Sequence, residues 1–220
     1  MNKANRPRKQ ARPDPFKDAK KRILVVCEGS TEKEYVDSYV ASLKNQLVVS
    51  VKAHGNSGVP ITVVERARDL QRENAEDARR ENDANVSFDS VWVMFDVDDH
   101  PRVGEAKQMA LDNGIAFAVS NPCIELWLYL HFADPPGMQD RHKLLRMLKK
   151  HILDYDKHIR FAFFRDGIEP ARKRAADLDH QAESDGEPGR NPTTGVWKLL
   201  NDIGEDEEKD QPGMLSLVSY

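Results

Sequence analysis

Short, uninterrupted apolar runs alternate with amphipathic segments between residues 22 and 132. The segments between the runs carry apolar residues three and four positions apart, as the buried face of a helix requires. Strands joined by helices form a parallel sheet with right-handed crossovers. The pattern therefore predicts an α/β fold with a four-stranded, mainly parallel sheet flanked by helices. The four runs, rich in β-branched and aromatic residues, are residues 22–27, 47–53, 91–95 and 115–120.

A long helix is expected from about Pro60 to Asn82, with proline in its first turn. From Arg66 to Arg80 it is densely charged, with mixed signs at helical spacing. This pattern is typical of a solvated helix face with ion pairs one turn apart. An arm that reaches toward a partner is the alternative.

Composition divides the rest of the chain. Residues 1–20 are basic, contain proline and lack periodicity, which predicts a disordered arm that either contacts phosphates or is an ordinary solvated tail. Residues 21–133 form the α/β core, which ends at the break Asp134-Pro135-Pro136-Gly137. Helical segments then predict an extension over residues 134–203 that packs on the core, and one of them begins near Asn191. Residues 204–220 form an acidic tail.

The overall composition bounds the class of protein. At 220 residues the chain can bury one substantial core, and its net charge of −4 argues against a general nucleic-acid-coating protein. No apolar run approaches the 18 or so residues of a membrane span, and the first 22 residues lack the apolar core of a signal peptide. Cys27 and Cys123 lie in apolar segments, which predicts buried free thiols. We therefore expect a cytoplasmic protein without a membrane partner.

Two carboxylates follow the third apolar run directly. Residues 91–95 lead into Asp96 and Asp98, whose side chains point to the same side of an extended chain. Two such charges repel each other unless a cation lies between them, and hard oxygen ligands suit Mg²⁺, Mn²⁺ or Ca²⁺. The alternative is an acidic strand end that is simply solvated.

A glutamate ends the first run, where Glu28 is followed by Gly29. The glycine permits a tight turn, and Ser30 or Thr31 is expected to cap the next helix. Compensation of the helix dipole explains Glu32 adequately. It explains Glu28 less well, because Glu28 precedes the glycine at the strand tip.

The fourth run ends at Ser120, where Asn121 is a suitable N-cap and Pro122 a suitable first residue of a helix that is apolar almost all round. Such a helix is expected to be central and buried. Glu125 is then an unusual residue, a carboxylate in the first turn of a buried helix. It either compensates the helix dipole or serves as a further ligand for a metal or its waters.

Connectivity brings these carboxylates together. Parallel strands end at the same edge of a sheet, and α/β proteins bind ligands beyond that edge. Glu28, Asp96 with Asp98, and the segment 120–125 each follow the carboxyl end of a strand. The sequence therefore predicts that they meet at one edge of the sheet.

Four stretches, taken in order, form a recognisable combination: residues 25–32 (VVCEGSTE), 95–98 (FDVD), 120–127 (SNPCIELW) and 191–193 (NPT). This combination resembles the RloB-like family, which is found beside bacterial restriction and abortive-infection loci and is similar to the Toprim fold. The resemblance covers about residues 21–200 and implies a Toprim-like sheet. One departure is Ile124, where a phenylalanine is expected before the glutamate, and it affects packing only.

The resemblance also implies roles for the acids. In Toprim domains a glutamate at the first strand tip and a D-x-D at a later tip bind Mg²⁺ for phosphodiester chemistry, and Glu28 matches the first, Asp96 with Asp98 the second. Glu32 matches the second acid of the E-x-x-x-E seen in OLD-type nucleases. No tyrosine is obviously placed as a strand-transfer nucleophile, which disfavours a topoisomerase.

The leading hypothesis is a nuclease of a phage-defence system that uses Mg²⁺ or Mn²⁺ to hydrolyse DNA or RNA. Glu28 would position or deprotonate water, and the metal would be held by Asp96 and Asp98. The expected supporting ligands are Glu32 and Glu125, and the expected substrate contacts are Ser120, Lys157 and Arg102.

Two other classes of function remain open. One is a regulatory subunit that binds metal and nucleic acid without cutting, and an ATPase encoded nearby is a further candidate partner. The other is a structural protein whose carboxylates are solvated strand ends.

Overall fold

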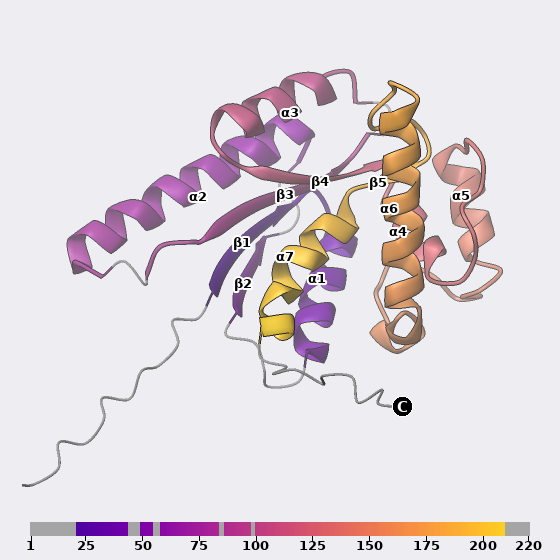
Figure 1. Cartoon of the computed structure of the whole chain (residues 1–220), viewed down its shortest axis with the longest axis horizontal. Coiled ribbons are helices and arrows are strands. Elements are labelled where there is room, and N and C mark those ends of the chain that lie inside the picture. Colours follow the sequence, from indigo (N-terminus) through magenta and orange to yellow (C-terminus); the bar gives the residue numbers. More distant parts are fainter. Residues whose placement is uncertain (1–20, 44–48, 55–57, 84–85, 98–99, 210–220) are drawn as a thin grey trace, which may run out of the picture.

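The structure, a computed structural model, is a single five-stranded sheet with helices on both faces (Figure 1). It describes residues 21–43, 49–54, 58–83, 86–97 and 100–209. The strand order is β2-β1-β3-β4-β5, and the first four strands are parallel, as predicted. The short β5 is antiparallel to β4 and was not predicted. The strands are β1 (Lys21–Cys27), β2 (Val49–His54), β3 (Ser90–Asp96), β4 (Ala116–Asn121) and β5 (Thr193–Thr194).

The continuous apolar runs are explained by burial on both faces of the sheet. In β1, which lies between β2 and β3, every residue from Ile23 to Cys27 is fully buried. Alternate side chains enter two different cores. Val25 joins the larger core with Trp92, whereas Leu24 joins the smaller one with Val91.

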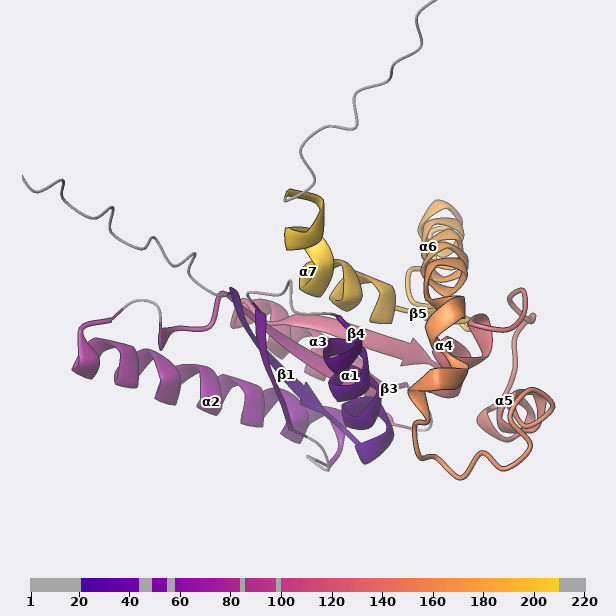
Figure 2. The same cartoon turned by 90° about the horizontal axis from the view of Figure 1, so that it is seen from below.

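Two sets of helices build these cores (Figure 2). The smaller core is covered by two helices that contribute Val63 and Ala106, among others. The larger core includes Tyr35, Trp127 and Leu199 from three further helices. The smaller core lies under α2 (Pro60–Glu81) and α3 (Val103–Asp112), and the larger under α1 (Ser30–Ser42), α4 (Glu125–Leu130), α6 (Ile168–Ser184) and α7 (Val196–Lys209).

The C-terminal segment shares the larger core with the sheet. Between α4 and α6 lie α5 (Arg141–Leu148) and two short 3₁₀ turns, η2 (Phe161–Phe163) and η3 (Arg165–Gly167). Leu144 and Leu148 of α5 are fully buried in the same cluster as Val25 and Trp127. The last helix runs to Lys209, so the segment from 204 to 209, expected to be tail, is helical.

The helix starts differ from the sequence-based expectation at three places. Neither Ser30 nor Thr31 caps α1, because Gly29 stands at the N-cap without a side-chain hydrogen bond. The predicted cap at Asn121 is wrong, since this residue ends β4 and its amide donates a hydrogen bond to the Gly189 carbonyl at 2.9 Å. The helix expected near Asn191 is wrong as well, because β5 occupies that stretch and α7 begins only at Val196.

Two other expectations, the ion pairs along α2 and the buried free thiols, are confirmed. The charged face of α2 carries ion pairs one turn apart, between Arg72 and Asp69 and between Arg80 and Asp77. Cys27 and Cys123 are buried free thiols. Within the part of the chain that the structure describes, no helix combines the length and apolar character needed to cross a membrane.

Candidate functional site

Three strand tips meet in one row at the carboxyl edge of the sheet. The Glu28 N–H donates to the Met94 carbonyl at 2.9 Å and so extends the pairing of β1 with β3. Asp96 is in register with Ser120, and the N–H of Val97 donates to the Ser120 carbonyl at 2.9 Å. The residues that connectivity was expected to bring together at these tips are therefore neighbours across the sheet.

Glu28 is held across the gap between β1 and β3. Its Oε2 accepts a hydrogen bond from the Asp96 N–H at 3.2 Å, and its Oε1 lies 3.0 Å from Nε2 of His100. The side chain remains 22% exposed. Glu28 is thus a positioned carboxylate that solvent can reach, in keeping with the argument that it does not cap the helix.

Glu32 is buried against the first turn of its own helix, with 5% of the residue exposed. Its burial, together with the negative charges of Glu28 and Glu125, raises its pKa to about 7, although the backbone N–H groups of Glu32 and Gly29 act in the opposite direction. These N–H contacts make Glu32 the acidic half of a capping box.

Gly29 is needed for space rather than for an unusual backbone angle. Its backbone is extended, at φ −119° and ψ −179°. A Cβ atom at this position would lie only 2.8 Å from Oε2 of Glu32. The glycine therefore makes room for the buried carboxylate, which differs from the tight-turn role inferred from the sequence.

Glu125 is the first residue of α4 and is also 5% exposed. The Tyr155 hydroxyl donates to its Oε1 over a long distance of 3.5 Å. Burial, followed by the charge of Glu125, raises the pKa of Tyr155, so the phenol stays protonated as a donor. Sequence reasoning missed Tyr155, whose only signal was its place in the acidic segment between two helices.

The structure describes only one of the two aspartates that were predicted to bind metal. Asp96 is 8% exposed at the end of β3, whereas Asp98 lies outside the described residues. Among the residues described, no group of three or more His, Cys, Asp or Glu side chains is arranged to hold a metal ion. Carboxylates are nevertheless the donors that Mg²⁺ prefers, and Mg²⁺ keeps several waters while using one or two carboxylates and substrate phosphates. The donor chemistry at this edge fits such a sparsely ligated ion.

The three predicted substrate contacts have different surroundings. Lys157 shares a cavity of about 290 Å³ with Glu125, and its carbonyl accepts a 2.9 Å hydrogen bond from the Thr31 hydroxyl. Ser120 is 1% exposed, and its hydroxyl is 2.9 Å from that of Thr194, so it joins β4 to β5. Arg102 forms a two-pronged ion pair with Glu105 at the start of α3. Lys157 therefore lines a cavity together with one of the predicted acids.

Comparison with known families gives one match. The model of the RloB-like protein family matches residues 23–203. The chain belongs to the RloB-like protein family. No curated protein and no solved structure matches it. Family membership therefore agrees with the resemblance of the four stretches, and the likeness to Toprim domains stays a prediction.

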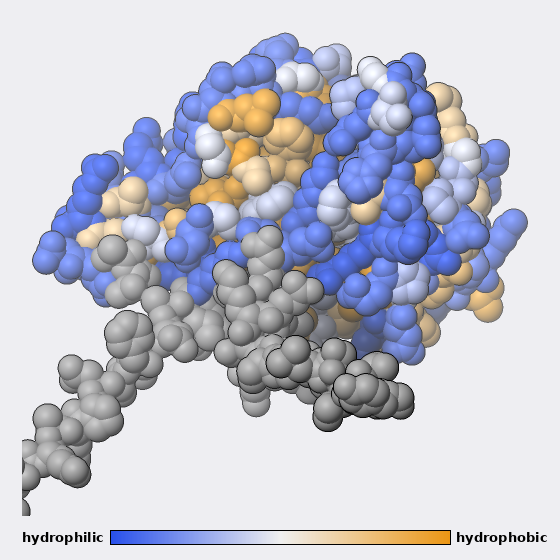
Figure 3. Space-filling model, in the orientation of Figure 1, coloured by the Kyte–Doolittle hydropathy of each residue, from blue (hydrophilic) through white to orange (hydrophobic). Residues whose placement is uncertain are grey.

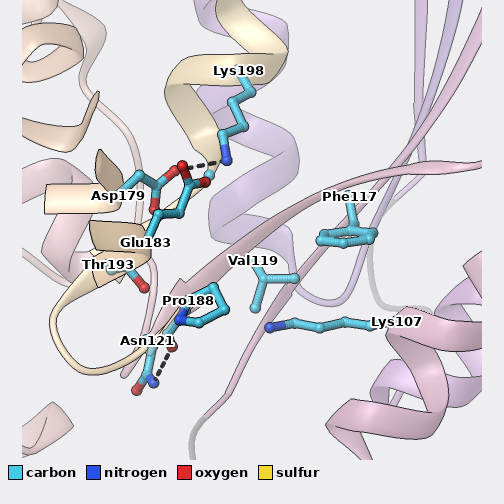
Figure 4. A pocket seen from close by; sticks show the side chains of 11 residues that line it. Lys107, Phe117, Val119, Asn121, Asp179, Glu183, Pro188, Thr193 and Lys198 are labelled. Atoms are coloured by element: carbon cyan, nitrogen blue, oxygen red, sulfur yellow. Dashed lines mark hydrogen bonds and ion pairs between the residues drawn. The ribbon is translucent and has the colours of Figure 1, made fainter. Parts of the chain in front are cut away.

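A second cavity of this RloB-like chain, of about 360 Å³, lies between α3, β4 and the C-terminal helices (Figure 4). Figure 3 shows that apolar residues gather on this side of the molecule between α3 and α6. Its buried carboxylate, Asp179, is 2.9 Å from Nζ of Lys198 and accepts a hydrogen bond from Nε1 of Trp197. Because its buried acid is paired and no predicted site residue lines it, this cavity is separate from the carboxyl edge of the sheet with Glu28, Glu32, Asp96 and Glu125, which we call the acidic edge.

Proposed function

We propose that this chain is a metal-dependent nuclease that hydrolyses phosphodiester bonds of DNA or RNA in a bacterial phage-defence or abortive-infection system. The observation that carries the proposal is the crowding of carboxylates at the carboxyl edge of the sheet. Glu32 and Glu125 are both buried there, and the charges of Glu28 and Glu125 help to raise the pKa of Glu32. Such crowding is costly without a cation, and strongly perturbed pKa values are typical of functional sites.

The residues divide into metal-holding and proton-accepting groups. Asp96 and Asp98 would hold Mg²⁺ or Mn²⁺, and Glu32 and Glu125 would bind its waters or a second ion. The bound metal would polarise the phosphate and stabilise the leaving oxygen. Glu28 is fixed by the Asp96 N–H and by His100 while remaining partly exposed, so it is suited to accept a proton from the attacking water.

Hydrolysis then follows from this arrangement. The water oxygen forms a bond to phosphorus as its proton passes to the Glu28 carboxylate, and the bond from phosphorus to the leaving oxygen breaks. Lys157, which shares a cavity with Glu125, offsets the charge of the phosphate. Lys157 thus acts on the substrate phosphate, Glu28 on the attacking water, and the other acids on the metal.

A second candidate function is a regulatory subunit that binds metal and nucleic acid without cutting. The observation in its favour is that Glu32 already caps α1 and that the described residues provide no three-ligand group. An ATPase encoded nearby would then supply the activity of the complex.

A cleavage assay tests the proposal. The purified protein is incubated with plasmid, single-stranded DNA and tRNA in the presence of Mg²⁺ or Mn²⁺. The wild type is expected to cut at least one of these substrates, and the double variant Asp96→Asn with Asp98→Asn to lose the activity. A matched control, Asp69→Asn with Asp77→Asn on α2, removes the same charge from an exposed helix and should cut normally.

Binding of metal and nucleic acid without cleavage by the wild type would replace the nuclease with the regulatory subunit. Equal cleavage by the wild type and the Asp96/Asp98 variant would move the active site elsewhere.

A further inference from the structure

The segment from 141 to 150, which comprises α5 and the two residues after it, contains basic residues and no acidic ones. All of its lysine and arginine side chains are exposed, whereas Leu144 and Leu148 are fully buried in the larger core. The buried leucines fix the orientation of the helix, so its cations face outward. We call these cations the basic helix face: Arg141, Lys143, Arg146, Lys149 and Lys150.

Most of these cations form no ion pair within the part of the chain that the structure describes. Lys143, Arg146, Lys149 and Lys150 form no ion pair with any of the residues that the structure describes. The charged helix α2 behaves differently, because three of its arginines, Arg68, Arg72 and Arg80, pair with Asp69 or Asp77. In a chain with a net charge of −4, four neighbouring cations without an ion pair to the described residues are a local feature that needs its own explanation.

Stabilisation of the helix does not explain all the cations of α5. Cations at a helix C-terminus interact favourably with the helix dipole, which accounts for Arg146 and the lysines that follow. Arg141 and Lys143, however, lie in the first turn, where the dipole is unfavourable to positive charge, and no acidic residue lies within that turn. The N-cap Asp140 accepts a hydrogen bond from the Lys143 N–H at 2.9 Å, which uses a backbone donor and not the ammonium group.

The basic helix face adjoins the acidic edge. Arg141, His142 and Leu145 line the cavity of about 290 Å³ that also contains Glu125 and Lys157. Figure 2 shows α5 next to α4, beyond the carboxyl ends of β3 and β4. A positive surface therefore leads to the end of the sheet at which Glu28, Glu32 and Asp96 gather.

Lys157 lies in a loop that lines the same cavity. Its backbone has φ 74°, a left-handed conformation that is uncommon for a lysine. The Thr31 hydroxyl holds its carbonyl, and the neighbouring Ile159 N–H donates to the Glu34 carboxylate at 3.0 Å. The loop is thus fastened to α1 in a conformation that places Lys157 at the cavity.

We propose that the basic helix face binds the phosphate backbone of a polynucleotide and guides it to the acidic edge. The proposal rests on the proposed function and names its substrate-binding surface. The eight residues of α5, at a rise of about 1.5 Å each, span about 12 Å, the length of about three to four phosphates along one strand of a duplex. The acidic edge repels phosphates, and the basic helix face supplies the complementary charge that brings them there.

The test measures binding of fluorescent single- and double-stranded oligonucleotides, of DNA and of RNA, between about 50 and 200 mM salt. The triple variant Arg146→Gln, Lys149→Gln, Lys150→Gln leaves the cavity residues in place. The matched control, Arg68→Gln, Arg72→Gln, Arg80→Gln, removes the same charge from α2. We expect the α5 variant to bind about 10- to 100-fold more weakly and its slope of log affinity against log salt to fall by about 2 to 3, because each lost phosphate contact removes about 0.7 to 0.9. The control should match the wild type.

Three results would overturn the inference. If the α5 variant binds with the affinity and salt slope of the wild type, the basic helix face is not the binding surface, while the proposed function stands. If the wild type binds no polynucleotide, both proposals fail. If the wild type prefers vesicles of anionic lipid to every oligonucleotide, and the α5 variant loses that binding, the surface recognises a membrane instead.

Discussion

A half-buried carboxylate, Asp202, and a buried one, Glu32, lie at opposite ends of the same sheet and have opposite environments. At the amino end, Asp202 of α7 accepts hydrogen bonds from Lys21 at 3.0 Å, Ser90 at 2.6 Å and Trp92 at 2.8 Å. Burial alone would raise the pKa of Asp202, but these three donors outweigh it and leave the pKa lowered. At the carboxyl end, burial and the charges of Glu28 and Glu125 raise the pKa of Glu32 to about 7.

The difference separates a structural acid from a candidate functional one. Asp202 is surrounded by donors and joins α7 to β1 and β3, so its charge contributes to the stability of the fold. Glu32 is surrounded by other acids, so its charge costs stability unless a cation or proton compensates it. Crowded like charges in a native protein are a mark of a functional site.

The largest expected effect is on catalysis, at the carboxyl end. Exchange of Glu28→Gln keeps an oxygen that can accept the Asp96 N–H but removes the charge and the basicity. If Glu28 accepts the proton of water, cleavage should fall by about 10²- to 10⁴-fold while the fold and the nucleic-acid affinity are retained. Initial cleavage rates measure this, and a rate close to that of the wild type would show that another group is the base.

The next effect is on stability, at the amino end. Asp202→Asn should lower the free energy of unfolding at pH 7 by about 1 to 2 kcal/mol, since it weakens charge-assisted hydrogen bonds to a partly exposed group. Because the folded-state pKa of Asp202 is lowered, its contribution is present above the ordinary pKa and is lost as the pH falls through the folded-state value. Urea unfolding at pH 7 and pH 3 checks this, and a loss that is larger at pH 3 would contradict it.

Glu32→Gln should show the opposite dependence on pH. The pKa of Glu32 rises from 4.5 to about 7 on folding, so the stability of the wild type is full below pH 4.5 and declines as the pH rises to 7. The variant lacks this decline and should gain about 1 kcal/mol or more over the wild type at pH 8, with little gain at pH 4.5. Urea unfolding of both proteins at the two pH values measures the gain. A difference in the free energy of unfolding that does not change with pH would show that the pKa of Glu32 is not raised in the folded protein.

The sheet and the acidic edge were within reach of sequence reasoning because both follow from connectivity. The apolar runs give the strands, and parallel strands must end at one edge, which placed Glu28 beside Asp96 without any structural information. Asp202 could not be assigned in this way, because its partner Lys21 lies 181 residues away and no local pattern links them. The pairing of Thr31 with Lys157, 126 residues apart, is hidden for the same reason.

Local sequence patterns were misleading where the same residues are compatible with both a helix start and the end of a strand. Asn121 followed by proline fits a helix start, yet the pairing of β4 with Thr193 of β5 continues to Asn121 and delays α4 to Glu125. A strand of two residues such as β5 is too short to produce a period in the sequence. The segment of the basic helix face contains no acids in the sequence, but the lack of ion pairs at Lys143, Arg146, Lys149 and Lys150 with any described residue is revealed only by the folded chain.

The most direct test of the acidic edge is thermal unfolding during a titration with Mg²⁺ or Mn²⁺. A ligand that binds the folded state stabilises it by mass action, by about 2.7 kcal/mol at a hundred times its Kd. The melting temperature of the wild type and of the Asp69/Asp77 control should rise with metal concentration, whereas the Asp96/Asp98 variant should show no shift. A wild type that neither metal stabilises, or an equal shift in the Asp96/Asp98 variant, would contradict the claim that these carboxylates are gathered around a divalent cation.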